Sequence, residues 1–285
     1  MDQLLLVLAV LLQAGDFAMN KLYQQRCGTS IQAGLTFNML LGLFSALLFW
    51  VAGGFRLELS WYSALMAAAF SAALMLYNLI GFRIMRIGSM ALYTLFLMTG
   101  GMLLPFVCGL LFWNEPFSWL RIAGLVLILA ATVLSGTGKA KPDAKTLLLC
   151  AAVFILNGCT SIFSKLHQME TGQLTVSAGQ FVVYTALAKA LMAGIALLFT
   201  KGEKQKSGSF SPVLFIFLSA LFSGVSYFCQ LLGQRNLPAT VLFPFITGGI
   251  MVCSTLSGML FFKDRPSRAV LAGVALSFIG TLFFL

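Results

Sequence analysis

The chain is a succession of long apolar runs separated by short polar segments. Hydrophobic residues are continuous within each run, a pattern typical of buried helices, whereas barrel strands would alternate apolar and polar positions. Most runs approach the roughly 20 residues that a helix needs to span hydrocarbon at about 1.5 Å per residue. Ten runs are delimited by charged or turn-forming residues: Leu4–Leu22, Ile31–Val51, Tyr62–Ile84, Met90–Phe112, Leu120–Leu134, Leu147–Leu166, Val176–Phe199, Val213–Leu232, Val241–Phe262 and Val270–Leu285.

Three of these runs carry a qualification. The fifth and tenth are short, so we expect their helices to begin earlier, near Ser118 and Ser267. The first resembles a signal sequence in its position, but nothing basic precedes it, and Gln13, Asp16 and Asn20 interrupt it. We therefore expect it to be a retained helix.

The composition places these helices in a membrane. Hydrophobic residues make up 60% of the 285 residues and charged residues only 9%, against about a quarter charged in soluble domains. We expect an all-α, multi-pass integral membrane protein whose lipid partner is the plasma membrane, or the inner membrane of a bacterium. The six cysteines show no paired metal-type spacing and are expected to be packing residues.

The sequence repeats itself. Thr99-Gly100-Gly101 returns as Thr247-Gly248-Gly249, and each triplet lies in an apolar run that is closed by an acidic residue. Further matches follow in the same order: Gly15 with Gly158, Lys21 with Lys165, Gly34 with Gly179, Arg83 with Arg235, and Gly124 with Gly273. The polar segment 138–145 predicts a linker between a first repeat at 1–137 and a second at 146–285, joined in one membrane domain. Because each copy holds five spans, the second must be inverted relative to the first, as in secondary transporters.

Two short motifs carry a family resemblance. Gly15 and Lys21 recur as Gly158 and Lys165, and an acidic residue closes the fourth helix before a Gly of the fifth: Glu115 with Gly124, and Asp264 with Gly273. These features resemble the drug/metabolite transporter superfamily, in particular its EamA-like members. The resemblance implies ten helices in two inverted five-helix repeats around a central cavity, lined mainly by helices 1, 3, 4, 6, 8 and 9. It implies no substrate, since the superfamily moves amino acids, amines, drugs, nucleotide sugars and sugar phosphates.

Two ionisable residues lie at membrane depth, where a charge costs about 2.5–3.5 kcal/mol on insertion scales. Asp16 follows Gly15, where the resembling families usually have a small neutral polar residue, and Lys189 lies at the centre of the seventh run. Asp16 is the candidate cation or proton site, because a buried carboxylate can release its proton when a cation arrives. Two alternatives stay open: Asp16 near the aqueous end of its helix, or Asp16 and Lys189 as a buried charge pair.

Polar side chains on the presumed cavity helices are the other candidate substrate contacts. In lipid each needs a partner, so a wet cavity and hydrogen bonds between helices are both natural surroundings. They are Gln13, Asn20, Tyr77, Asn78, Tyr93, Thr94, Asn157, Thr160, Ser161, Tyr227, Gln230 and Thr247. The double glycines are expected to permit close helix packing or bending, and Glu115 and Asp264 to cap turns.

The net charge of +10 serves as a topology signal, because no basic stretch is long enough to indicate nucleic acid. Arg56, Arg121, Lys165 and Arg235 flank one side of the membrane, Lys189 lies within it, and the other basic residues flank the opposite side. The positive-inside rule then places both termini outside the cytoplasm. The family resemblance implies the reverse, and a fluorescent reporter fused to Leu285 would decide between them.

The sequence therefore predicts a secondary transporter of a small polar or cationic metabolite or drug, such as an amino acid or amine, that works by alternating access with or without proton coupling. A lipid-carrier flippase of the same fold, a passive channel and an assembly partner are the alternatives. An intramembrane enzyme would need clustered acid–base or ligand residues, and His167 is the only histidine. No phosphate-binding glycine loop followed by Lys and Ser or Thr is present, so we expect no ATP drive within this chain. We also expect no cofactor and no metal. A homodimer is compatible with this interpretation.

Overall fold

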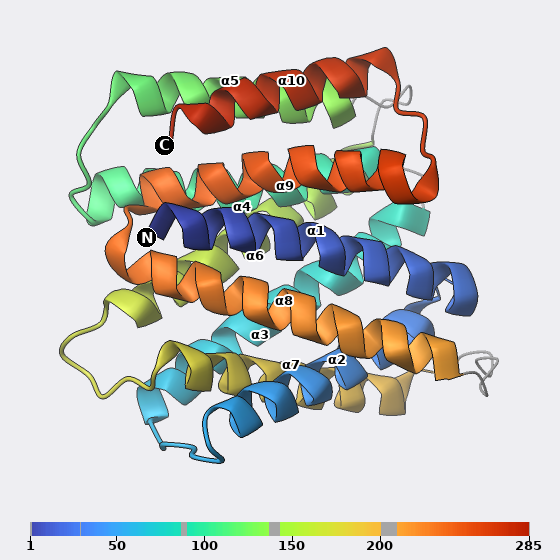
Figure 1. The fold of residues 1–285 in the computed structure, drawn as a ribbon, viewed down its shortest axis with the longest axis vertical. Helices are drawn as coiled ribbons and strands as arrows, with labels where there is room; N and C mark the ends of the chain where they lie inside the picture. The colour runs from blue at the N-terminus through green and yellow to red at the C-terminus, as the bar shows by residue number, and fades with distance from the viewer. Residues whose placement is uncertain (1, 29, 87–89, 137–142, 201–209, 285) are drawn as a thin grey trace.

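The computed structural model describes residues 2–28, 30–86, 90–136, 143–200 and 210–284. Within these ranges the chain forms ten α-helices and no strand (Figure 1). The helices are α1 Asp2–Cys27, α2 Ile31–Ala52, α3 Trp61–Arg86, α4 Met90–Phe112, α5 Trp119–Gly136, α6 Ala144–Met169, α7 Ala178–Phe199, α8 Phe210–Asn236, α9 Ala239–Phe262 and α10 Arg268–Leu282. The ten predicted helices are confirmed, and α5 and α10 begin directly after Ser118 and Ser267 as expected.

Eight of the ten helices are long and apolar enough to cross a membrane, namely α1 to α4 and α6 to α9. The described parts of α5 and α10 are apolar but shorter. The protein is therefore an integral, multi-pass membrane protein built of helices. Helices that are consecutive in the chain run in opposite directions through the bundle (Figure 1).

Polar side chains mark where several helices begin. Ser30, Asp143, Ser177 and Ser267 each precede a helix, and each side chain accepts a hydrogen bond from the backbone amide three residues later. Such caps satisfy amide groups that have no partner within the helix. At Asp143, which lies outside the membrane spans, hydrogen bonds from Thr146 hold the pKa of the carboxyl below its ordinary value.

Packing joins the two halves of the chain throughout. Each helix makes its most extensive contact with a helix from the other half: α1 with α8, α2 with α7, α3 and α4 with α6, α5 with α10, and α9 with α1. Figure 1 shows α1 beside α8 and α5 beside α10. The two halves form one intertwined bundle and are not two separately packed units.

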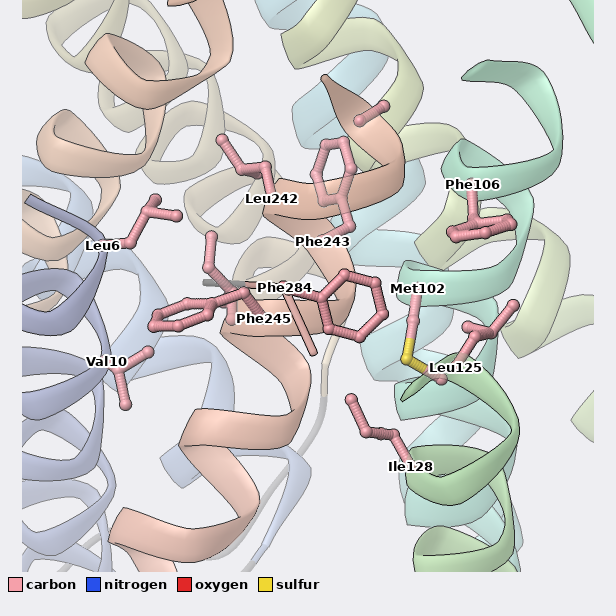
Figure 2. Close-up of a cluster of buried hydrophobic side chains, with 12 residues drawn as sticks. Leu6, Val10, Met102, Phe106, Leu125, Ile128, Leu242, Phe243, Phe245 and Phe284 are labelled. Carbon is pink, nitrogen blue, oxygen red and sulfur yellow. The ribbon is translucent and has the colours of Figure 1, made fainter. Parts of the chain in front are cut away.

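The largest buried apolar cluster illustrates this packing. Figure 2 shows side chains from α1, α4, α5 and the turn after α10 converging on α9: Leu6, Val10, Met102, Phe106, Leu125, Ile128, Leu242, Phe243, Phe245 and Phe284. Since lipid tails are as apolar as these side chains, close van der Waals fit and not water exclusion is what holds such helices together.

The repeated glycine pairs lie at the tightest crossings. A Cβ atom added at Gly100 would lie 2.1 Å from the backbone carbonyl oxygen of Phe154 on α6, and one at Gly248 would lie 2.2 Å from Thr281 Oγ1. Only a residue without a side chain fits such an approach. The expectation that these pairs permit close packing is confirmed, with α4 meeting α6 and α9 meeting the end of α10.

Candidate functional site

Asp16 is the one buried carboxylate among the buried polar residues that the structure describes, with 8% of its surface exposed. It lies on α1 and faces α8. Its Oδ2 atom accepts a hydrogen bond from Gln13 Nε2 at 2.9 Å, and its Oδ1 atom accepts one from the hydroxyl of Ser219 on α8. Gln13 stands one helical turn before Asp16, which brings both side chains onto the same face of α1. A carboxylate at membrane depth is thus held by two neutral donors.

The polar contacts continue along the line where α1 meets α8. The hydroxyl of Ser226 donates to the carbonyl of Ala9 at 2.7 Å and accepts a hydrogen bond from Gln230 Nε2 at 3.2 Å, and it lies 3.3 Å from Gln13 Oε1. Of the predicted site residues, the structure therefore brings Gln13, Asp16 and Gln230 together in one network. Sequence reasoning missed Ser219 and Ser226, since a serine in an apolar run ordinarily bonds to its own helix.

Lys189 provides the second charge. It lies on α7 within electrostatic range of Asp16. The direct pair considered from the sequence is not formed: within the described ranges, Lys21 with Asp264 is the one ion pair at 4.0 Å or less. Gln13 and Ser219, and not Lys189, donate the hydrogen bonds described above to the carboxylate of Asp16.

The predicted residues on α6 hold helices together in this conformation. Asn157 Nδ2 donates to the carbonyl of Leu97 on α4 at 2.6 Å, and the Ser161 hydroxyl donates to that of Gly101 at 3.1 Å. Thr160 returns to the Asn157 carbonyl of its own helix at 2.6 Å. On α1, Asn20 accepts from Gln24 at 2.9 Å.

The remaining predicted residues are dispersed. Tyr77 and Tyr93 pack beside the buried cluster of Ile84, Cys150 and Val153. Tyr227 stacks on Phe70 with ring centroids 5.3 Å apart. Asn78 and Thr247 are partly buried on α3 and α9.

Thr94 lies apart from Asp16, at a cavity of about 250 Å³ between α4, α5, α9 and α10. A second cavity of about 450 Å³ adjoins it at the turn from α9 to α10, and Ser254, Thr255 and Val270 line both. Asp16 lines neither cavity.

His167 lies near the end of α6, and its side chain is buried. Its Nε2 atom lies 2.9 Å from the Ser63 hydroxyl, and its ring stacks on Phe181 with centroids 3.7 Å apart. The Ser63 hydroxyl also accepts from the amide of Val176 at 3.0 Å. These contacts tie α3, α6 and the start of α7 together, which is a structural role.

The described residues include no disulfide and no cluster of side chains that could hold a metal ion. All six cysteines are free, and two of them, Cys150 and Cys229, are buried. Across the described residues no group of three or more His, Cys, Asp or Glu side chains is placed to hold a metal ion.

Glu115 and Asp264, the acidic residues expected to cap turns, bind partners in the other half of the chain. Glu115 crosses to the other half, where its carboxylate accepts hydrogen bonds from the amides of Ala239 and Thr240 at 2.6 and 2.8 Å. Lys165, expected from its charge to flank the membrane, is instead only 4% exposed. Its ammonium donates to the carbonyls of Gln234 and Leu237 at 2.6 and 2.7 Å.

Comparisons with known proteins agree with this fold. A solved crystal structure matches 99% of this chain and 95% of its own with a TM-score of 0.79, and at 17% sequence identity this likeness concerns the fold alone. A search of curated proteins finds no significant match.

The family comparison covers the second half of the chain. Residues 144–285, which contain α6 to α10, match the EamA-like transporter family. Together with the bundle of long apolar helices, this match points to a membrane transporter of the drug/metabolite type rather than an enzyme. This part of the chain, 144–285, is therefore similar to the EamA-like transporter family.

Proposed function

We propose that the protein is a secondary transporter that moves a small polar or cationic metabolite or drug, such as an amino acid or amine, by alternating access. The observation that carries the proposal is the buried carboxylate of Asp16 between α1 and α8, held by Gln13 and Ser219. Ionisable groups at this depth are costly and commonly mark substrate or proton pathways. In this proposal the ammonium group of the cargo, or a proton, binds Asp16.

We propose further that the chain consists of two inverted repeats, 1–137 and 146–285, joined by the linker 138–145. In this proposal α1 to α5 correspond in order to α6 to α10. Helix contacts support it, because replacing both helices of a contact by their counterparts gives another observed contact: α1 with α8 becomes α6 with α3, and α4 with α6 becomes α9 with α1. The contacts of α2 with α7 and of α5 with α10 join counterparts, so this replacement leaves them unchanged.

Matching backbone details at the ends of α4 and α9 support the same equivalence. Asn114 and Lys263 both have positive φ, at 51° and 54°, a conformation uncommon for residues other than glycine. The next residue in each half, Glu115 or Asp264, donates its amide to the carbonyl of a glycine earlier in its helix, at 3.0 and 3.1 Å. An identical device at two places in one chain is difficult to explain without a common repeat.

The coupling proposal also rests on Asp16. Since its carboxylate already accepts two neutral hydrogen bonds, a cation approaching it replaces or joins Gln13 and Ser219. Lys189 nearby disfavours a second cation, so one positive charge at a time occupies the site. This arrangement favours exchange of a proton for a cationic cargo, and an anionic group on the cargo, such as the carboxylate of an amino acid, would meet Lys189.

Ligand binding by purified protein tests the site. A thermal-shift screen of amines, amino acids, cationic drugs and nucleotide sugars is expected to identify a stabilising cationic ligand, because a ligand that binds only the folded state raises its stability. Asp16→Asn should abolish that shift, whereas Asp143→Asn, which removes an exposed carboxylate at the start of α6, should retain it. Equal ligand shifts in the wild type and Asp16→Asn would contradict the assignment.

A further inference from the structure

The corner between α8 and α9 is fastened at both of its helix ends by charged side chains from elsewhere in the chain. Lys165, on α6, donates two hydrogen bonds to the last carbonyls of α8 and the corner. Glu115, which follows α4, accepts two from the first amides of α9. The corner lies at the end of the bundle that also holds both chain termini (Figure 1), here called the terminal end.

The charges suit the ends that they bind. The carbonyl end of a helix carries partial negative charge and the amide end partial positive charge, so an ammonium fits the former and a carboxylate the latter. Hydrogen bonds to ionised groups are about twice as strong as neutral ones. Lys165 and Glu115 thus carry opposite charges and bind the two helix ends of one corner. The terminal end is therefore held closed by four charge-assisted hydrogen bonds.

At the opposite end the equivalent residues have a different arrangement. Lys21 and Asp264 occupy the places of Lys165 and Glu115 in the repeat, yet they bind each other at 2.6 Å. Their side chains remain 40% and 49% exposed. Asp264 and Arg265 also border the cavity of about 450 Å³. An exposed ion pair of this kind adds little stability, because water screens the two charges.

Helix packing shows the same asymmetry. In the described part of the chain α6 packs against α8, and Lys165 is one of the residues that joins them. The equivalent pair, α1 and α3, makes no contact of similar extent. Side-chain partners and helix contacts thus both distinguish a fastened terminal end from a looser opposite end.

We infer that Glu115 and Lys165 form the gate that closes the terminal end, and that Asp264 and Lys21 form the equivalent gate at the opposite end. The inference rests on the proposed alternating access. In the other state of the transporter, Asp264 binds the first amides of α4 and Lys21 the carbonyls at the end of α3. Glu115 and Lys165 then release the α8–α9 corner and pair with each other, as Lys21 and Asp264 do here.

Distances between spin labels test this gate without measuring transport. In a cysteine-free background, one label pair at Phe117 and Arg235, both exposed, spans the terminal end, and another at Gln24 and Arg83, also exposed, spans the opposite end. Glu115→Gln removes the charge that holds α9, so the ratio of open to closed terminal ends should rise roughly tenfold or more. The Phe117–Arg235 distance then lengthens and the Gln24–Arg83 distance shortens.

Asp264→Asn is the matched control, since it removes the equivalent carboxylate. It weakens closure at the opposite end and should leave the terminal end closed, with both distances as in the conformation described above. Lys165→Gln should act in the same direction as Glu115→Gln, and thermal melting of each variant shows whether it is folded. Unchanged distances in folded Glu115→Gln and Lys165→Gln, or the same shift in Asp264→Asn, overturn the gate.

These measurements can reject the gate without rejecting the carrier function. Unchanged distances in variants that still perform saturable counterflow reject the gate and leave the carrier function standing. The predicted distance changes in Glu115→Gln, together with unchanged distances in Asp264→Asn, support the gate, whatever cargo the protein moves.

Discussion

At the scale of single residues, the proposed chemistry lies where the two halves differ. Asp16 stands opposite Cys159 in the repeat, and Lys189 stands opposite Phe44. Both charges could be singled out from the sequence, because ionisable groups are rare in apolar runs. Ser219 could not, since serine bonds to its own helix as readily as to a neighbour. The residue on α8 that donates a hydrogen bond to the Asp16 carboxylate is set by how α1 packs against α8.

Removing the Ser219 hydroxyl should weaken binding of a cationic cargo. Hydrogen bonds to charged groups contribute about 1.5–3 kcal/mol, so Ser219→Ala is expected to raise KM in transport by roughly tenfold or more. Ser223→Ala is the control, because the Ser223 hydroxyl donates at 2.7 Å to the carbonyl of Ser219 within the same helix. A KM equal to that of the wild type in Ser219→Ala, measured by initial uptake rates, would remove Ser219 from the site.

At the scale of helices, the helix boundaries could be predicted from the sequence, but the hydrogen bonds between helices could not. Charged residues and N-capping serines mark where the runs end, so the observed helices begin and end within a few residues of the predictions. The sequence also indicated that the double glycines serve packing. It did not show that Asn157 and Ser161 bond to the α4 backbone, because either a wet cavity or a neighbouring helix satisfies such groups in a membrane.

The crossing of α4 and α6 should tolerate no side chain at Gly100. A Cβ atom there would overlap backbone atoms of Phe154, the nearest at 2.1 Å, and backbone cannot turn aside as a side chain can. Gly100→Ala is expected to destabilise the protein by roughly 1–3 kcal/mol or more, seen as a lower melting temperature in detergent. Gly179→Ala is the control, since the nearest atom, of the Phe228 ring, lies 3.8 Å away. Equal melting of Gly100→Ala and the wild type would refute the close approach.

At the scale of the whole molecule, the class was evident from the continuous apolar runs and the scarcity of charge. Which helices pack together was not, because the repeat in the sequence says only that the halves are alike. The structure shows that every helix makes its most extensive contact with a helix from the other half of the chain. It also adds the difference between the two ends, where equivalent lysines and acids have different partners. That difference could not be predicted from a sequence that places a lysine and an acidic residue at both ends.

Counterflow in proteoliposomes tests the central claim, that the protein is a carrier with Asp16 as its cation site. Vesicles preloaded with the cationic ligand found in the binding screen should accumulate labelled ligand transiently, at a rate that saturates with concentration. Asp16→Asn should abolish this exchange, and the exposed-site variant Asp143→Asn should retain it. Flux that rises linearly with concentration, is unaffected by preloading, or persists in Asp16→Asn would contradict the account.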